Sequence, residues 1–357
     1  MKTYIKFITY TYLRSFLNIF LIMLGLVFIL NLLSELDFFK NLEVDAFVPL
    51  YLSMLNYGSL IFEMFPFIFL ISTQFFFINL FYDNQIQIFK YSGLKNSSII
   101  IIISSFSIIL GIVVITFFYN FSSSLKNVYL ELKSKYSSDD KYLAVITKNG
   151  LWIKDKLDNK ISIVNASRIE GKFLKDTFIT QFNENYVVIR NIRSEKINIE
   201  EKNWVAYDAK VFENNSSSEK SELNIQSNFD YQKIKSLFSN LSSLSIFGLI
   251  ELKKNYKSLN YSTTEVDMQI NKIFTFPIYL TLMTILASII MFNTKRFKST
   301  ILKISVGLFS SVVIYYVNNF SNVMGKTEKV SLMLSIMIPL LTLFFINFFL
   351  LYKINEK

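Results

Sequence analysis

The chain contains neither cysteine nor histidine among its 357 residues. These two absences exclude disulfide bonds, thiol nucleophiles, imidazole bases and the usual zinc and iron ligands. We therefore expect no catalytic residue, no metal site and no cofactor bound by the chain itself. A chain without cysteine suits an oxidising compartment, although the absence alone does not identify one.

Apolar residues, by contrast, are in excess. They make up 52% of the chain, with 37 phenylalanines and a mean hydropathy of +0.38. Soluble domains contain about 45–50% apolar residues, and here the apolar residues are gathered in long blocks, which predicts an integral membrane protein. The formal charge of +10 could indicate a nucleic-acid partner. Because the lysines and arginines lie beside the apolar blocks, where they orient membrane spans, we expect no nucleic acid to bind.

Six apolar stretches are long enough, at ~17–25 residues, to cross a bilayer as helices. The first, Ser15–Leu33, could be a signal peptide. It exceeds the roughly 7–15 apolar residues of a signal sequence, however, and no small-residue cleavage site precedes the polar segment after it, so we interpret it as a retained span. The other spans are expected at Ser59–Tyr82, Ile99–Tyr119, Ile270–Phe292, Ile301–Val317 and Ser331–Tyr352. An interfacial or tilted entry near Pro49–Tyr57 is expected to precede the second span, and Pro66 is expected to kink that span.

Residues 121–267, between the third and fourth spans, predict a separate β domain. Short strands separated by turn signals such as Lys148–Gly150 and Asp158-Asn159 have the spacing of an antiparallel sandwich or jelly roll. The expected strands are Tyr142–Thr147, Leu151–Lys154, Lys160–Val164, Thr177–Phe182, Tyr186–Ile192, Lys196–Glu200 and Trp204–Phe212. Asn214–Ser221 is expected to be a loop and Leu244–Leu259 a helix, with Trp152 and Trp204 in the β-domain core.

The predicted fold is therefore membrane α-helical, with three spans on each side of an inserted all-β domain. The expected boundaries are residues 1–120, 121–267 and 268–357, and Asn318–Val330 is expected to connect the last two spans. Six spans place both termini, the polar segment 83–98 and the loop 293–300 on one side. Because lysine and arginine dominate there, the positive-inside rule makes this side cytoplasmic.

The polar segment that follows the second span alternates apolar and polar residues and ends in Ser92-Gly93. This pattern predicts one or two turns of amphipathic helix over residues 83–93, ended by Gly93 in the left-handed conformation. Such a helix suits a lever that a separate motor protein grips. The residues expected to make that contact are Asp83, Gln85, Ile86, Phe89, Tyr91 and Gly93. The alternative is a merely solvated loop, which would leave three apolar side chains exposed without purpose.

Two charged residues of the predicted spans are candidates for a functional role. Glu63 precedes Pro66 by three residues, and an ionisable residue inside a membrane is a functional candidate by default. The alternative is a carboxylate near the outer interface that faces a partner subunit. Lys272, at the start of the fourth span, could contact substrate or anchor its helix by reaching the interface.

The stretch Met324–Thr327 resembles the end of a nucleotide-binding loop. The first glycine of that motif would have to stand where Phe320 is, so we expect no nucleotide to bind this chain.

Several short motifs together resemble the LptF/LptG family of lipopolysaccharide export permeases. They are Phe65-Pro66, Ser92-Gly93, the hairpin Gly150–Asp155, and Lys272–Phe274 followed by Pro277. The hairpin favours the LptG member. The resemblance implies a multipass inner-membrane permease of a Gram-negative bacterium, with its β domain in the periplasm. It implies as partners a sister permease, an LptB-like ATPase dimer that binds the ATP, and an LptC/LptA-like jelly-roll bridge.

The resemblance also implies roles for individual residues. Lys40 falls where the family places basic residues near the lipid phosphates, so Lys40, Glu63 and Lys272 are the candidate substrate residues. An interfacial lysine that reaches the headgroups is the alternative for Lys40. Gln85 stands where relatives usually carry a glutamate, so either Asp83 supplies the charge or a neutral hydrogen bond replaces it.

Two other classes of protein remain as alternatives. A stand-alone secondary transporter would show broken helices or inverted repeats, neither of which is evident here. A lipoprotein-releasing permease normally has four spans.

Overall fold

The computed structural model describes residues 3–42, 44–45, 47–133, 136, 151–157, 160–213, 216–231, 234, 240–258, 262–293 and 299–355. Two compact units are present. One comprises Met1–Tyr129, Ser242–Leu249 and Thr264–Lys357, and the other Leu130–Leu241 and Ile250–Thr263. The expected strand Tyr142–Thr147 and the turn at Lys148–Gly150 lie outside the described residues.

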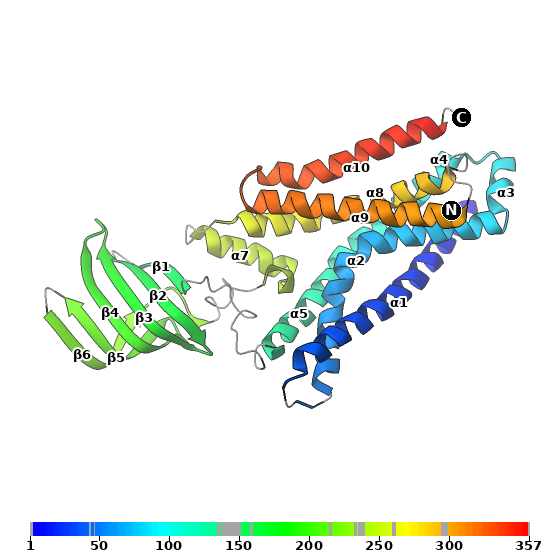
Figure 1. The fold of residues 1–357 in the computed structure, drawn as a ribbon. Coiled ribbons are helices and arrows are strands. Elements are labelled where there is room, and N and C mark those ends of the chain that lie inside the picture. Colours follow the sequence, from blue (N-terminus) through cyan, green and yellow to red (C-terminus); the bar gives the residue numbers. More distant parts are fainter. Residues whose placement is uncertain are drawn as a thin grey trace. The chain divides into compact units, whose positions relative to one another are not determined.

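Six helices of the described chain are long and apolar enough to cross a membrane, which confirms the predicted number (Figure 1). They are α1 (Thr3–Phe39), α2 (Phe47–Tyr82), the continuous helix Asn96–Lys133, α8 (Thr264–Phe292), α9 (Thr300–Lys326) and α10 (Leu332–Asn355). The third consists of α4 (Asn96–Val113), the π-helical segment η1 (Val114–Tyr119) and α5 (Asn120–Lys133). Two shorter helices are α3 (Gln85–Tyr91) and α7 (Ile246–Ser258).

Several predicted helix boundaries differ from the structure, among them those at α2 and α9. α2 begins at Phe47 and includes Pro49–Tyr57, so this entry is part of the same long helix and the interfacial alternative was wrong. α9 continues to Lys326, so most of Asn318–Val330 is helix rather than a connection. In both places the helix satisfies its backbone hydrogen bonds internally, and in an apolar medium this outweighs the low intrinsic helix propensity of residues such as asparagine.

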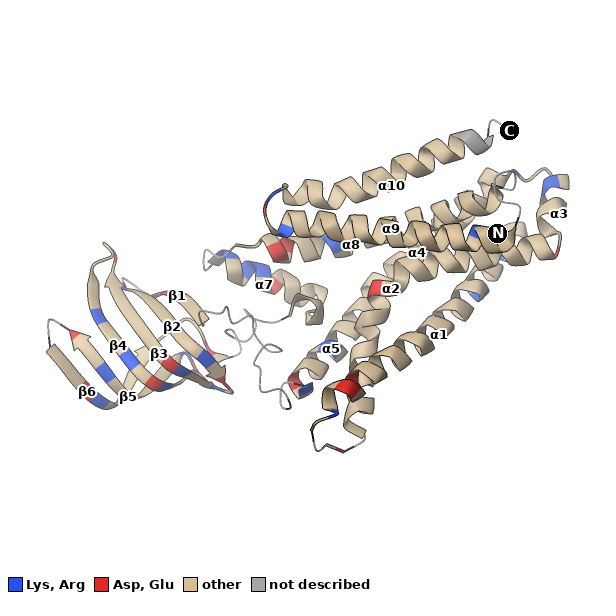
Figure 2. Cartoon of the chain, viewed as in Figure 1, with Lys and Arg blue, Asp and Glu red and all other residues tan. Residues whose placement is uncertain are grey.

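Within the helical unit, the N- and C-termini and α3 lie at the same end (Figure 1). The turn between α9 and α10 lies at the opposite end. Positively charged residues mark the first end on α1, α3 and the start of α9 (Figure 2). The arrangement of the ends therefore agrees with the predicted six-span topology.

A cluster of buried hydroxyl groups connects four helices of this unit. The Tyr12 hydroxyl lies 3.1 Å from Ser107 Oγ, 3.4 Å from Thr284 Oγ1 and 3.5 Å from Thr73 Oγ1. These side chains come from α1, α4, α8 and α2, and Tyr12 is completely buried. Hydrogen bonds between spans fix how helices pack where the hydrophobic effect does not distinguish one apolar neighbour from another.

We expect Tyr12→Phe to lower the free energy of unfolding in detergent by about 0.5–1.5 kcal/mol, because the remaining hydroxyls lose a shared partner. Tyr10, on the same helix, is 66% exposed and is the matched control. Tyr10→Phe should leave the unfolding transition unchanged. Equal unfolding of the two variants would show that the cluster adds nothing to stability.

The second unit is built on one antiparallel sheet in the order β1-β2-β3-β4-β5-β6, which confirms an inserted β domain. Its strands are β1 (Leu151–Leu157), β2 (Lys160–Glu170), β3 (Phe173–Asn183), β4 (Val188–Asn198), β5 (Asn203–Glu213) and β6 (Ser216–Gln226). Among these strands each pairs only with its neighbours along the chain, so the crossover connection of a jelly roll does not occur between them.

Two strand predictions were wrong. The expected strands Tyr186–Ile192 and Lys196–Glu200 are mostly parts of one strand, β4. The expected loop Asn214–Ser221 instead contains the start of β6, a charged and exposed strand that its pairing with β5 holds in place. Lys210 and Glu219 face each other across this pair at 2.9 Å. Their hydrogen bond raises the pKa of Lys210 and lowers the pKa of Glu219.

The aspartate of the family hairpin motif has a structural role in the β unit. Asp155 accepts hydrogen bonds from Ser227 Oγ (2.8 Å), the Asn228 backbone N–H (3.0 Å) and Asn228 Nδ2 (2.9 Å). Trp204 Nε1 donates to the Phe229 carbonyl at 2.7 Å. The segment after β6 is thus tied to both β1 and β5. Trp204 is buried as predicted, whereas Trp152 is 55% exposed and does not belong to the core, because alternate residues of β1 face opposite sides of the sheet.

Candidate functional site

A cavity of about 150 Å³ lies among α2, α8, α9 and α10, towards the α9–α10 end of the helical unit. Its wall combines aromatic rings with charged and amide side chains. The lining residues are Phe62, Glu63, Pro66, Lys272, Thr275, Phe276, Tyr279, Tyr315, Asn318, Asn319, Asn322, Ile336 and Leu340. Polar groups are expensive in a membrane-spanning unit, so their gathering at one cavity marks a candidate binding site.

Two of the predicted substrate residues, Glu63 and Lys272, line this one cavity. Glu63 interacts electrostatically with Lys272 and with Lys126 of α5, while Lys326 at the end of α9 repels Lys272. Neither Glu63 nor Lys272 forms a direct ion pair with any residue in the described part of the chain. Glu63 therefore interacts with two lysines, of which only Lys272 lines the cavity with it.

The asparagines of α9 were missed as site residues because we had assigned them to a connection outside the membrane. Asn318 and Asn322 are four residues apart and Tyr315 precedes Asn318 by three, so the three side chains lie on one helix face. None of Asn318, Asn319 and Asn322 has a hydrogen-bond partner in the described chain, so their amides can bond a ligand or water. A helical interpretation of residues 315–322 would have placed these asparagines in the span and identified them as candidates.

Lys40, the third predicted substrate residue, lies elsewhere. It is exposed in the turn that follows α1, and it is not among the residues that line the cavity. A single chain therefore brings two of the three predicted residues together.

The α3 segment has the predicted local structure. It forms a seven-residue helix, and Gly93 has φ of +80°, in the left-handed region. The Leu94 backbone N–H donates to the Phe89 carbonyl at 2.9 Å, which closes the helix as a Schellman turn. At the other end, Asn84 is also left-handed, and the Gln85 side-chain amide donates to Asp83 at 3.2 Å.

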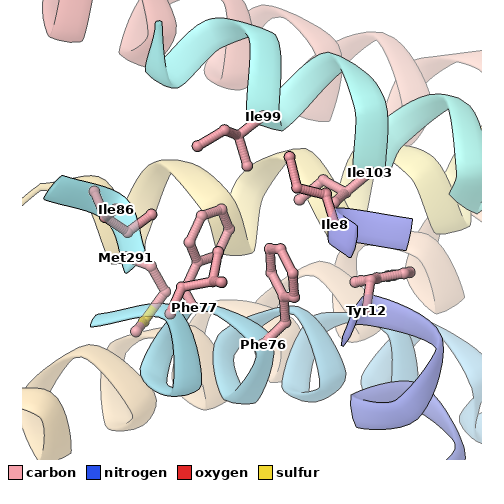
Figure 3. Packing of buried hydrophobic residues seen from close by; sticks show 9 residues of the cluster. Ile8, Tyr12, Phe76, Phe77, Ile86, Ile99, Ile103 and Met291 are labelled. Carbon is pink, nitrogen blue, oxygen red and sulfur yellow. The ribbon is translucent and has the colours of Figure 1, made fainter. Parts of the chain in front are cut away.

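Contrary to our prediction, the apolar side chains of α3 are not all exposed for a partner but are partly buried in the chain's own bundle. Ile86 is buried against the chain's own α1, α2, α4 and α8 (Figure 3). Phe89 packs on the same cluster, and the centres of the Phe89 and Phe7 rings lie 6.1 Å apart. We had expected both to be free for a partner. A helix this short does not hold its shape alone, and these two side chains fasten it to the bundle. The exposed apolar side chains of α3 are Tyr91, at 90%, and Ile88, at 59%.

Six membrane-spanning helices, an inserted β domain and a charged cavity between helices are the features of a polytopic membrane permease. The model of one family, lipopolysaccharide export system permease LptF/LptG, matches residues 6–353, nearly the whole chain. The chain belongs to this family and is a lipopolysaccharide export permease of the inner membrane, as its motifs predicted. The choice of the LptG member stays a prediction. No curated protein matches the chain.

Proposed function

We propose that this chain is one permease half of an ABC exporter that withdraws lipopolysaccharide from the inner membrane and passes it to a periplasmic bridge. A separate ATPase dimer supplies the energy, and a sister permease completes the membrane part. The observation that carries this proposal is the separation of two surfaces in one helical unit. A cavity lined by charged and amide side chains lies towards one end, and the exposed residues of α3 lie at the other.

The cavity has the chemistry of a phosphate site. Lys272 can donate a charge-assisted hydrogen bond to a phosphate oxygen, and the three α9 amides can donate neutral ones. The cavity volume of about 150 Å³ suits a single phosphate group of a larger lipid. Glu63 acts as the resting counter-ion of Lys272, and an arriving phosphate displaces it. The Glu63 carboxylate then promotes release of the lipid, because it competes with the lipid phosphate for Lys272.

The motor contact belongs to the exposed side of α3. Tyr82, Ile88 and Tyr91 are large side chains left in solvent at the end of the bundle, which is the composition of a binding hot spot. Asp83 and Gln85 provide polar contacts at its rim. Ile86 and Phe89 act indirectly, because they attach α3 to the bundle and so pass a movement of α3 on to the other helices.

We place the termini and α3 in the cytoplasm, on the strength of the positive charges at that end. The β unit then lies in the periplasm. β1 and β6 are the edge strands of the described sheet, and strand addition at such an edge is how a partner of like fold would dock.

The orientation can be tested with single cysteines, because the natural chain has none. We expect Asn185→Cys, in the exposed turn after β3, to react with a membrane-impermeant maleimide applied to spheroplasts. Asn84→Cys, beside α3, should react only after the membrane is permeabilised. The reverse pattern would invert the topology and contradict an ATPase contact at α3.

Co-purification with ATP-dependent photo-crosslinking of lipid tests the function itself. A complex that contains an ATPase dimer and a second permease, and that moves lipid only when ATP is hydrolysed, is the expected result. A homogeneous chain with no ATPase would instead favour a secondary transporter.

A further inference from the structure

We propose that Lys303 is a positioning residue that joins α3 to the two cavity helices α8 and α9, so that a movement of α3 reaches the cavity. The inference rests on the proposed function, since it assumes that a motor moves α3. Lys303 lies near the start of α9, at the same end of the unit as α3.

The surroundings of Lys303 are unusual for a lysine at the end of a span. Such a lysine normally extends its amine to the headgroups or to water. Lys303 is only 7% exposed, and its Nζ donates to the Met291 backbone carbonyl at 3.1 Å. The amine also lies 5.1 Å from the centre of the Phe81 ring, a cation–π contact. Burying a cation in this way is costly, and a neutral chain such as methionine would fill the same space.

The carbonyl that Lys303 binds explains why a cation is useful there. Met291 is in the last turn of α8, where carbonyls have no partner within the helix and the helix dipole is negative. The Lys303 ammonium group donates a hydrogen bond to such a carbonyl and places a positive charge at the negative end of the dipole. Lys303, on α9, therefore caps the C-terminus of α8. It thereby connects the ends of two helices that supply Lys272 and the asparagines to the cavity.

Both residues that bind the amine belong to, or pack against, the buried cluster that contains Ile86 of α3. The Met291 side chain lies in the same cluster as Ile86 (Figure 3). The Phe81 ring packs against this cluster. The Phe81 carbonyl in addition accepts a hydrogen bond from the Asn84 N–H, at 3.2 Å, in the turn that leads into α3. A displacement of α3 therefore reaches Lys303 through this shared cluster and through the backbone hydrogen bond to Phe81.

The backbone of α9 at Lys303 is fixed by contacts with α2. The Gln74 side-chain amide of α2 donates to the Lys303 carbonyl at 2.9 Å. One turn further along α9, Gly307 rests directly on the Gln74 amide, and a Cβ atom at Gly307 would overlap it. From Lys303, α9 runs as a continuous helix to Asn318, a distance of roughly 22 Å at 1.5 Å per residue. A tilt of α9 at Lys303 therefore moves the asparagines that line the cavity.

The test uses the complete complex of both permeases and the ATPase, reconstituted in vesicles that contain lipopolysaccharide. The variants are Lys303→Met, which removes the charge, Lys303→Arg, which keeps it, and Lys6→Met, a matched control at an exposed lysine of the same end. Three quantities are measured: recovery of the ATPase with the permease, the rate of ATP hydrolysis, and lipid released per ATP hydrolysed.

We expect Lys303→Met to retain the ATPase and to hydrolyse ATP within about twofold of the natural complex, while releasing about tenfold less lipid per ATP. Lys303→Arg should restore at least half of the release, and Lys6→Met should behave as the natural chain. Unchanged release per ATP in Lys303→Met overturns the inference. So does a proportional loss of recovery, hydrolysis and release, since Lys303 would then only support assembly.

A second pair of variants tests the joint without altering the lysine. Gly307→Ala should push α9 away from Gln74 and lower release per ATP as Lys303→Met does. Adding Gln74→Ala makes room for the new methyl group but removes the hydrogen bond to the Lys303 carbonyl, so release per ATP should stay low. Release that is unaffected by Gly307→Ala, or fully restored in the double variant, contradicts the inference. If the natural complex itself shows no ATP-dependent release, the proposed function fails instead.

Discussion

Lys272→Ala is expected to lower the capture of lipopolysaccharide by a photo-crosslinker placed at the cavity by roughly tenfold to a hundredfold. A charge-assisted hydrogen bond to a phosphate contributes about 1.5–3 kcal/mol, and the α9 amides alone would not replace it. Glu63→Gln should act in the opposite direction. It removes the carboxylate that competes with phosphate for Lys272, so capture should rise and release on ATP hydrolysis should slow.

The control for this experiment is Lys257→Ala, an exposed lysine of α7 that does not line the cavity. It should capture lipid as the natural chain does. Equal capture by Lys272→Ala and Lys257→Ala would remove the cavity from the transport route. A fall in capture with Glu63→Gln would mean that the carboxylate contacts the lipid directly and is not a displaced counter-ion.

The second large effect is expected at α3, where Ile86 and Ile88 form a matched pair two residues apart. Ile88 is 59% exposed and Ile86 only 5%. Ile88→Ala should weaken the pull-down of the ATPase, and Tyr91→Ala should remove about 2–4 kcal/mol of binding if its ring is a central anchor of the contact. Both variants should keep the thermal unfolding of the isolated permease unchanged.

Ile86→Ala should instead destabilise the permease itself by about 2–4 kcal/mol, because it leaves a cavity among α1, α2, α4 and α8. Gln85→Glu tests the family's missing glutamate, since a carboxylate should tighten binding where the motor presents an arginine. If Ile88→Ala and Tyr91→Ala both retain the ATPase fully, the motor grips another surface.

Residues close together in the sequence were sufficient to predict most of the architecture. A span needs only a continuous apolar run, because a helix satisfies its own backbone hydrogen bonds in the membrane. The left-handed Gly93 was likewise predictable, since a helix end followed by glycine depends on a few adjacent residues. The family resemblance depends on short local motifs of the same kind.

Which surface each residue faces was decided only by the tertiary structure. The pattern of α3 showed that Ile86, Phe89 and Tyr91 belong to an amphipathic helix, but not that the first two pack against the chain's own bundle. In the same way Trp152 and Trp204 look equivalent in sequence, yet only Trp204 is buried. The number and identity of the neighbours come from segments far away in the chain.

The charged sites show this division most clearly. Sequence alone determined that Glu63 and Lys272 are candidates, because an ionisable side chain beside an apolar run carries a cost that does not depend on the fold. Only the packing of α2 against α8 and α9 decided that these two share a cavity while Lys40 lies outside it. Lys303 lies in the predicted span Ile301–Val317 but was interpreted only as a cytoplasmic positive charge. Its role follows from a carbonyl on α8 and a ring on α2, which the folded chain brings to the same amine.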